Sequence, residues 1–577
     1  MIRRLALAWV AVALTAPTLR AQQPLSRDLL PTHTSLNRAG LERQWNTSVP
    51  LGHAFETVLA VSLSSNTETV YGTVTNANLD IDPVTDEGSV PSTTQFIADG
   101  ELSSLDDVYV GSRLVITSGP MKGTSRRIIG YNGTTKTFRL GSGLPASPQQ
   151  GTAFTLFESL VYVQTNEANF YAYDAESGRL LWSTNLTPNK ALGLKIAKAM
   201  PVSANSRAVF VSNANTLFAL DRGTGKTLWT QELPSLPSGS TAATEDIVTV
   251  GLTSGRMMGY ALKDMKPRKS GPGRGRGAGT LGGTAADALA QAAVDEAEFR
   301  AAPYLEHPVP IWSWQSDSAL TAPALPAGEV VSFGSGDGRV FTVLAKQPLL
   351  LYRFATGGPI VAQMGALGTR TLVVPSMDHN LYAIDLFTGE RKWLFPTGSP
   401  IDHPVLISAR EIFVQNTGGE LSSVHPDTGE AEWTTSTFGG DIVAVSGAKL
   451  YLRTHDGDLL VLDRATGKIT QDARSTRQRA GLDLRSFKLT MTNTINDRIY
   501  LASPSGSLIC LREIDQVEPK SLRDPAEKPF GYIPPEGIED PFNARAVVPA
   551  TEAPTPDPAT TEAPAPDPAA EAPEPKG

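Results

Sequence analysis

The chain has 577 residues and a formal net charge of −9, with a pI of about 5.5. An acidic chain lacks the basic surface that nucleic-acid binding requires, so nucleic acid is excluded as the main partner. Cys510 is the single cysteine, which excludes an intramolecular disulfide, a zinc cluster built on cysteines and CxxC chemistry.

The N-terminal segment MIRRLALAWVAVALTAPTLRAQQ has the three parts of a secretory signal peptide. Arg3 and Arg4 form the positive region, a short apolar run follows, and Ala21 provides a small residue at the cleavage point. We therefore predict a signal peptide over residues 1–21 and a periplasmic or secreted protein, with an uncleaved anchor as the alternative. After residue 21 no stretch is long and apolar enough to cross a bilayer.

The next segment, residues 22–40, is predicted to be a helical lead-in that ends at Gly40. Residues 41–46 (LERQWN) then read as a single strand carrying Trp45, although no partner strand precedes them.

Residues 161–186 contain the pattern that recurs along the chain. The segment VYVQTNEANFYAYDAESGRLLWSTNL predicts two strands of β-branched and aromatic residues, a turn and a third strand. Similar segments occur at residues 208–233, 372–394 and 411–433. A repeat of about 40 residues made only of strands and turns is typical of a propeller blade, because a twisted four-stranded sheet buries both faces only by stacking on its neighbours.

Each unit ends in an Asp, a turn containing Gly, and a Trp. The Asp carboxylate can accept hydrogen bonds from the backbone of the turn, Gly tolerates a left-handed conformation, and Trp covers apolar area between neighbouring blades. We predict a structural role for all of these repeat residues: Asp174, Gly178, Trp182, Asp221, Gly225, Trp229, Asp385, Gly389, Trp393, Asp427, Gly429, Trp433 and Trp45.

The combination A-x-D-x-x-T-G-x-x-x-W at this spacing resembles the pyrroloquinoline-quinone (PQQ)-like repeat family of β-propellers, over most of residues 41–514. The resemblance implies an all-β propeller fold and leaves two kinds of function open. Similar quinoprotein dehydrogenases hold PQQ with a calcium or lanthanide ion in the central channel and use an Asp base and, in many, a ring of two adjacent cysteines. Similar scaffold propellers of bacterial envelopes, such as the outer-membrane-assembly propeller, bind other proteins.

The repeat count predicts an eight-bladed propeller over residues 41–72 and 159–514. Residues 498–514 contain the first two strands of a blade without the third, so we predict that the N-terminal strand closes this last blade and removes the free edges of the ring. Seven blades is the alternative, if the degenerate unit at residues 328–354, with Tyr352 in place of Trp, forms no sheet of its own.

Residues 73–158 interrupt the first full blade. Alternating runs such as 113–116 and 136–140, with Asn132-Gly133 as a hairpin turn, predict a small inserted β domain. An elaborate loop is the alternative. The predicted function of the insert is that of a contact module standing off one face.

A second interruption, residues 265–307, is predicted to be a flexible basic linker and a short helix capped by Thr284 and Asp287. A formal GxGxxG within it follows no strand, so it predicts no dinucleotide site. Residues 515–548 are Pro-rich and extended, and residues 549–577 form a Pro/Ala/Glu tail that cannot bury a core and is predicted to be disordered.

Few side chains are candidates for chemistry. Each Trp lies at the repeat position, the lone Cys510 cannot form a two-cysteine ring, and the histidines show no HxxH or HExxH spacing. Asp402 and His403, just before an innermost strand, are the candidates for a site facing the channel.

We therefore predict a non-catalytic, exported and monomeric propeller that binds envelope or secreted proteins and needs no cofactor. The alternatives are a quinoprotein oxidoreductase with PQQ and calcium on the axis, and a propeller that senses a sugar or peptide ligand.

Overall fold

The computed structural model describes residues 28–533 apart from 66–69, 80–89, 101, 103–105, 107–108, 110–111, 158, 188–198, 206, 240, 264–303, 348, 409–410, 524–527 and 529. The predicted signal peptide, the predicted linker and its helix as far as residue 303, and the predicted tail lie outside the described residues.

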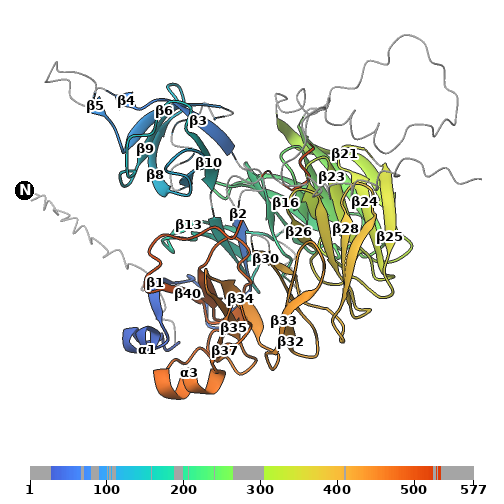
Figure 1. The fold of residues 1–577 in the computed structure, drawn as a ribbon. Coiled ribbons are helices and arrows are strands. Elements are labelled where there is room, and N and C mark those ends of the chain that lie inside the picture. Colours follow the sequence, from blue (N-terminus) through green and yellow to red (C-terminus); the bar gives the residue numbers. More distant parts are fainter. Residues whose placement is uncertain are drawn as a thin grey trace, which may run out of the picture. The chain divides into compact units, whose positions relative to one another are not determined.

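The strands of the described residues form eight four-stranded antiparallel sheets, which make an eight-bladed β-propeller and follow one another in chain order (Figure 1). Seven blades are each built from four strands in chain order. The first blade has β2 (Val58–Ser65), β11 (Ser159–Thr165), β12 (Asn169–Asp174) and β13 (Leu180–Asn185). The second has β14 (Ser203–Ala204), β15 (Ala208–Asn213), β16 (Thr216–Asp221) and β17 (Thr227–Glu232), and the third has β18 (Ala242–Ala243), β19 (Ile247–Gly251), β20 (Arg256–Lys263) and β21 (Tyr304–Gln315).

The next four blades repeat this order. The fourth has β22 (Leu325–Ala327), β23 (Val330–Gly334), β24 (Arg339–Leu344) and β25 (Leu350–Ala355), and the fifth has β26 (Gly365–Leu367), β27 (Thr371–Pro375), β28 (Asn380–Asp385) and β29 (Arg391–Pro396). The sixth has β30 (Leu406–Ser408), β31 (Glu411–Gln415), β32 (Glu420–Val424) and β33 (Ala431–Ser436), and the seventh has β34 (Asp441–Val445), β35 (Lys449–Arg453), β36 (Leu459–Asp463) and β37 (Ile469–Gln471). The degenerate unit is thus a full blade, the fourth, and the seven-bladed alternative is wrong.

The eighth blade joins the two ends of the propeller. It contains β38 (Leu489–Thr490), β39 (Ile499–Ala502), β40 (Ser507–Glu513) and, as the outermost strand, β1 (Leu41–Ser48). Strand β1 pairs antiparallel with β40 along its whole length, and Trp45 lies opposite Cys510. Figure 1 shows the blue β1 beside the red β40. The predicted closure by the N-terminal strand is confirmed.

The burial of the strands explains why the repeat can be recognised in the sequence. Strands β11 and β12 are buried at nearly every position, because a neighbouring blade covers each face of the sheet. The outer strand β13 alternates instead, and Trp182 is its one buried residue. Continuous apolar runs followed by a polar strand with a single Trp are therefore the natural sequence of a blade.

The insert in the first blade is a closed six-stranded barrel in the order β10-β3-β6-β9-β8-β7. Its strands are β3 (Val70–Asn76), β6 (Gln95–Gly100), β7 (Arg113–Ile116), β8 (Ser125–Asn132), β9 (Thr137–Leu140) and β10 (Ala153–Phe157), and a separate two-stranded sheet joins β4 (Asn78–Leu79) to β5 (Val90–Pro91). Phe96, Phe138 and Phe154 fill the barrel, with ring centroids 5.4–5.7 Å apart. The inserted β domain is confirmed, and the loop alternative is wrong.

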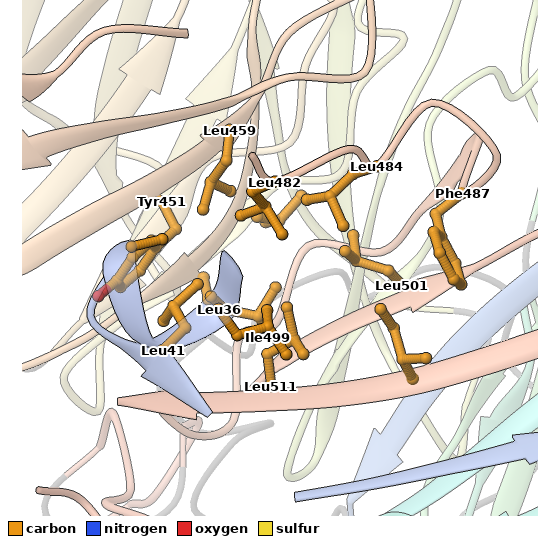
Figure 2. Close-up of a cluster of buried hydrophobic side chains, with 14 of the residues drawn as sticks. Leu36, Leu41, Tyr451, Leu459, Leu482, Leu484, Phe487, Ile499, Leu501 and Leu511 are labelled. Carbon is orange, nitrogen blue, oxygen red and sulfur yellow. The ribbon is translucent and has the colours of Figure 1, made fainter. Parts of the chain in front are cut away.

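Two helices lie beside the closing blade. Helix α1 (His33–Arg38) precedes β1, and helix α3 (Ala473–Ala480) runs from its N-cap Asp472 to Gly481, whose φ is +70°. No pattern in the sequence predicts α3. Figure 2 shows the cluster of apolar side chains there, in which Leu36 and Leu41 meet residues of the seventh and eighth blades such as Tyr451, Leu459, Ile499 and Leu511.

Candidate functional site

The Asp of each repeat closes its own turn. Asp174 Oδ1 accepts hydrogen bonds from the backbone N–H groups of Glu176 (3.0 Å) and Ser177 (2.7 Å). Asp221 accepts from the Thr224 N–H at 2.8 Å in the same way. Asp385 accepts from two turn N–H groups, each at 3.0 Å. Each carboxylate thus accepts hydrogen bonds from its own turn, because buried or half-buried backbone N–H groups require an acceptor.

The sixth blade departs from the pattern, and the assignment of Asp427 needs correction. His425, not Asp427, stands four residues before Gly429, and its Nδ1 accepts from the N–H groups of Asp427 and Thr428, both at 3.3 Å. The Gly429 N–H also donates to the His425 carbonyl. The capping position lies four residues before the Gly in this blade too, and a His occupies it in place of the Asp.

Each repeat Gly lies against the ring of the preceding blade. A Cβ on Gly225 would lie 2.3 Å from Cε3 of Trp182, so any side chain would collide with the indole. The same arrangement recurs for Gly178 on Trp45, Gly389 on Tyr352, Gly429 on Trp393 and Gly467 on Trp433. The position therefore requires glycine for a close approach as well as for its positive φ.

The indole N–H of the outer-strand Trp is bonded across the blade boundary. It donates to a backbone carbonyl of the following blade, within the segment that connects that blade's last two strands. The pairs are Trp45 to Ala175 (3.0 Å), Trp182 to Arg222 (2.8 Å), Trp312 to Ala345 (2.7 Å), Trp393 to Pro426 (2.7 Å) and Trp433 to Arg464 (3.1 Å). These tryptophans hold neighbouring blades together, so a ligand site has to be sought elsewhere.

Asp402 and His403 meet a third residue that the sequence analysis missed. His403 lies between β29 and β30, and its Nδ1 is 2.6 Å from Asp402 Oδ1. Its Nε2 is 3.2 Å from Asp441 Oδ1, and Asp441 begins β34, the innermost strand of the next blade. The hydrogen bond to Asp441 raises the pKa of His403; burial opposes this rise, and the charge of Asp402 adds to it. The cluster links two blades at the inner end of their sheets.

A pH-dependent contribution to stability should follow. A raised folded-state pKa means that protonated His403 stabilises the fold fully below its ordinary pKa of about 6.5, and that this contribution is lost as the pH rises through the raised value. For a partly exposed cluster we expect roughly 0.2–1 kcal/mol. The difference in Tm between the wild type and His403→Asn should therefore be larger at low pH than at high pH.

Thermal unfolding of both proteins across this range, with an NMR titration of the imidazole, is the measurement. His455→Asn is the control, because no ion pair joins His455 to another described residue. Parallel Tm curves for the wild type and His403→Asn would show that the cluster is electrostatically silent.

One end of the ring carries exposed apolar side chains. In an antiparallel meander, the connection from the outer strand of one blade to the inner strand of the next lies at the same end as the link between the second and third strands. We call this end the loop face. Four of the inter-blade connections present an exposed apolar side chain there: Phe55 (84%), Leu236 (55%), Val361 (37%) and Phe438 (82%).

Phe438 is also strained. Its φ is +53°, a left-handed conformation that is unfavourable for a residue with a Cβ, and Gly439 follows it with φ +77°. An exposed aromatic ring held in such a conformation does not stabilise the fold by packing in the core. Strain of this kind is concentrated at binding sites. No pattern in the sequence singled out Phe55 or Phe438, because exposure of a loop side chain has no periodic signal.

The opposite end of the first blade contacts the barrel. Arg127 of β8 is 2.8 Å from Asp174 Oδ2, and Arg113 of β7 is 2.8 Å from Glu176 Oε2. Burial raises the pKa of Glu176, and the charge of Arg113 opposes that rise. Asp174 thus caps its turn with one oxygen and holds the barrel with the other.

The described residues offer few ligands for a metal or a cofactor. They contain no group of three or more His, Cys, Asp or Glu side chains arranged to hold a metal ion. Cys510, the single cysteine of the sequence, is fully buried opposite Trp45, so the two-cysteine ring of the quinoprotein alternative has no counterpart here. Among the described helices, none is both long and apolar enough to cross a membrane.

The chain is an eight-bladed propeller of PQQ-like repeats. A family model described as outer membrane protein assembly factor BamB matches residues 132–297 and 312–537, which together make up more than half of the sequence, so the chain belongs to that family. No curated protein matches the chain by sequence.

Several solved structures resemble the chain. BamB from Moraxella catarrhalis is 17% identical with a TM-score of 0.46, and the match covers 62% of this chain and 93% of that one. The computationally designed protein Ika8 is 14% identical with a TM-score of 0.43, covering 61% and 92% of the two chains. A chain of the mitotic checkpoint complex is 16% identical with a TM-score of 0.37, covering 52% and 83%.

Proposed function

We propose that the protein is an exported, non-catalytic scaffold of the cell envelope that binds other proteins through its loop face. The observation that carries the proposal is the pair of exposed aromatic residues Phe55 and Phe438, of which Phe438 is held in a strained conformation with no packing role. Buried aromatic anchors supply much of the energy of protein interfaces, so exposed rings on a rigid ring of blades suit this role.

Two further features support the assignment. The chain belongs to a family described as outer membrane protein assembly factor BamB, and a role beside envelope proteins agrees with that description. The signal peptide predicted for residues 1–21 would deliver the chain to that compartment. The barrel, tied to the first blade by Arg113 and Arg127, provides a second surface for contacts.

Replacing both aromatic residues should abolish capture of partners. We expect the double variant Phe55→Ser/Phe438→Ser to recover the proteins that bind the wild type from envelope extract only at background level, since two anchors of about 2 kcal/mol each correspond to a several-hundredfold loss of affinity. Its Tm should be unchanged, because neither ring is buried and Ser keeps a Cβ at position 438, so the left-handed strain stays the same.

The control is Ile514→Ser/Val517→Ser, which removes two apolar side chains that are also exposed (42% and 66%) but follow the last strand, away from the inter-blade loops. Quantitative mass spectrometry of the captured proteins compares the three baits. Equal recovery by all of them would contradict binding through the loop face and would leave the barrel as the contact surface.

A further inference from the structure

The third blade lacks the turn that covers the outer-strand Trp of the preceding blade elsewhere in the ring. Strands β20 and β21 continue past the usual turn position, so that Lys263 pairs with Tyr304. No Asp-Thr-Gly turn therefore lies over Trp229 of the preceding blade. Among the described residues no glycine packs on the Trp229 ring and no acceptor is found for its indole N–H.

A cavity of about 320 Å³ occupies this position, between the second and third blades. Phe210, Trp229 and Leu262 form its apolar wall, and these three side chains are almost completely buried. Arg207, Tyr304 and Glu306 lie at its rim. The volume falls within the range of sites for small organic molecules, and the combination of an apolar wall with a few polar groups is typical of them.

Arg207 is oriented for binding. Its guanidinium carbon lies 4.5 Å from the centroid of the Tyr304 ring, and the Tyr304 hydroxyl donates to Glu245 Oε2 at 3.0 Å, which fixes the ring. Stacking uses the face of the guanidinium and leaves its N–H groups in the plane. No described residue accepts a hydrogen bond from these N–H groups. A carboxylate matches this planar fork with two parallel hydrogen bonds.

Glu306 restricts the charge of the ligand. Glu306 lines the same cavity as Arg207, so its negative charge disfavours a ligand with two or more negative charges more strongly than a ligand with one. A single carboxylate on an apolar body meets both requirements.

We propose that this cavity binds a small organic monocarboxylate, with its carboxylate on Arg207 and its apolar or aromatic body against Trp229, Phe210 and Leu262. The site is formed because one blade lacks the turn that covers the Trp in its neighbours. It is separate from the loop face and does not depend on the proposed scaffold function.

The test uses the full chain and 3-phenylpropionate as the probe. Titration followed by calorimetry should give saturable binding with a Kd below about 1 mM. Arg207→Gln should weaken binding by about tenfold or more, and the uncharged analogue 3-phenylpropanol should lose a similar factor, because both changes remove a charge-assisted hydrogen bond. Arg391→Gln, at an exposed arginine on the outer strand of the fifth blade, is the control and should bind as the wild type does.

An NMR measurement keeps the test independent of small changes in stability. The indole N–H resonance of Trp229, assigned from its loss in Trp229→Phe, should shift on addition of the probe. Absence of saturable binding, or equal affinity of the wild type and Arg207→Gln, would overturn the proposal. It would also be overturned by binding that appears only when residues 264–303 are replaced by a short Gly-Ser linker, since the chain's own segment would then be the occupant.

Discussion

A chain that begins at residue 49 is expected to lose the stable closed ring. Removing β1 takes the outermost strand from the eighth blade and uncovers β40 along its whole length. It also removes Trp45 and Leu41, both of which are buried. Loss of one buried Trp side chain alone costs about 3–5 kcal/mol, which is a large part of the roughly 5–15 kcal/mol by which a folded domain is stable. We expect Tm to fall by at least about 10 °C, or no cooperative transition at all.

Cys510 reports on this opening directly. In the intact protein the thiol is fully buried opposite Trp45, and burial raises its pKa well above the ordinary value. Thiol reagents should therefore react slowly with the wild type and rapidly with the shortened chain. A chain that begins at residue 28 retains β1 and α1 and is the control.

Rescue separates ring closure from a general loss of stability. A peptide of residues 28–48 added to the shortened chain should restore both Tm and protection of Cys510, because an exposed β40 is a template for exactly one complementary strand. Unchanged Tm and unchanged thiol reactivity after removal of β1 would contradict closure by the N-terminal strand.

Much of the fold was predictable because a blade is a local pattern. The alternation between buried inner strands and an outer strand with one Trp is visible in residues 161–186, and the unmatched strand with Trp45 indicated how the ring closes. Helix α3 escaped prediction because its sequence, ARSTRQRA, has no apolar stripe. Its position depends on the short outer strand β37, which leaves room beside the seventh blade.

The sites were less predictable, since they depend on residues far apart in the sequence. Asp402 and His403 were identified as a pair, but Asp441 joins them only because two neighbouring blades place their inner strands together. The cavity at Trp229 arises from a turn that is missing, and an absent glycine leaves no motif to find. A repeat therefore specifies the scaffold, whereas its exceptions specify candidate sites.

The two functions of the repeat glycine can be separated by a matched pair of substitutions. Gly225 and Gly398 have nearly the same φ, +70° and +74°, so Ala at either position meets the same left-handed strain of about 1–2 kcal/mol. A Cβ at Gly398 has no atom within 4 Å, whereas at Gly225 it would lie 2.3 Å from the Trp182 ring. We expect Gly398→Ala to cost about 1 kcal/mol and Gly225→Ala about 3 kcal/mol, because overpacking adds roughly 1–3 kcal/mol.

Urea unfolding of both variants measures the difference, and a double-mutant cycle with Trp182→Ala identifies its cause. Trp182→Ala alone should cost about 3–5 kcal/mol. In that background the extra penalty of Gly225→Ala should disappear, since the atoms with which the Cβ collides are gone, and only the backbone strain should remain. If Gly225→Ala and Gly398→Ala destabilised the protein equally, the recurring spacing of Gly and Trp between blades would reflect the turn alone, and the packing of each glycine on its neighbour's ring would not contribute to stability.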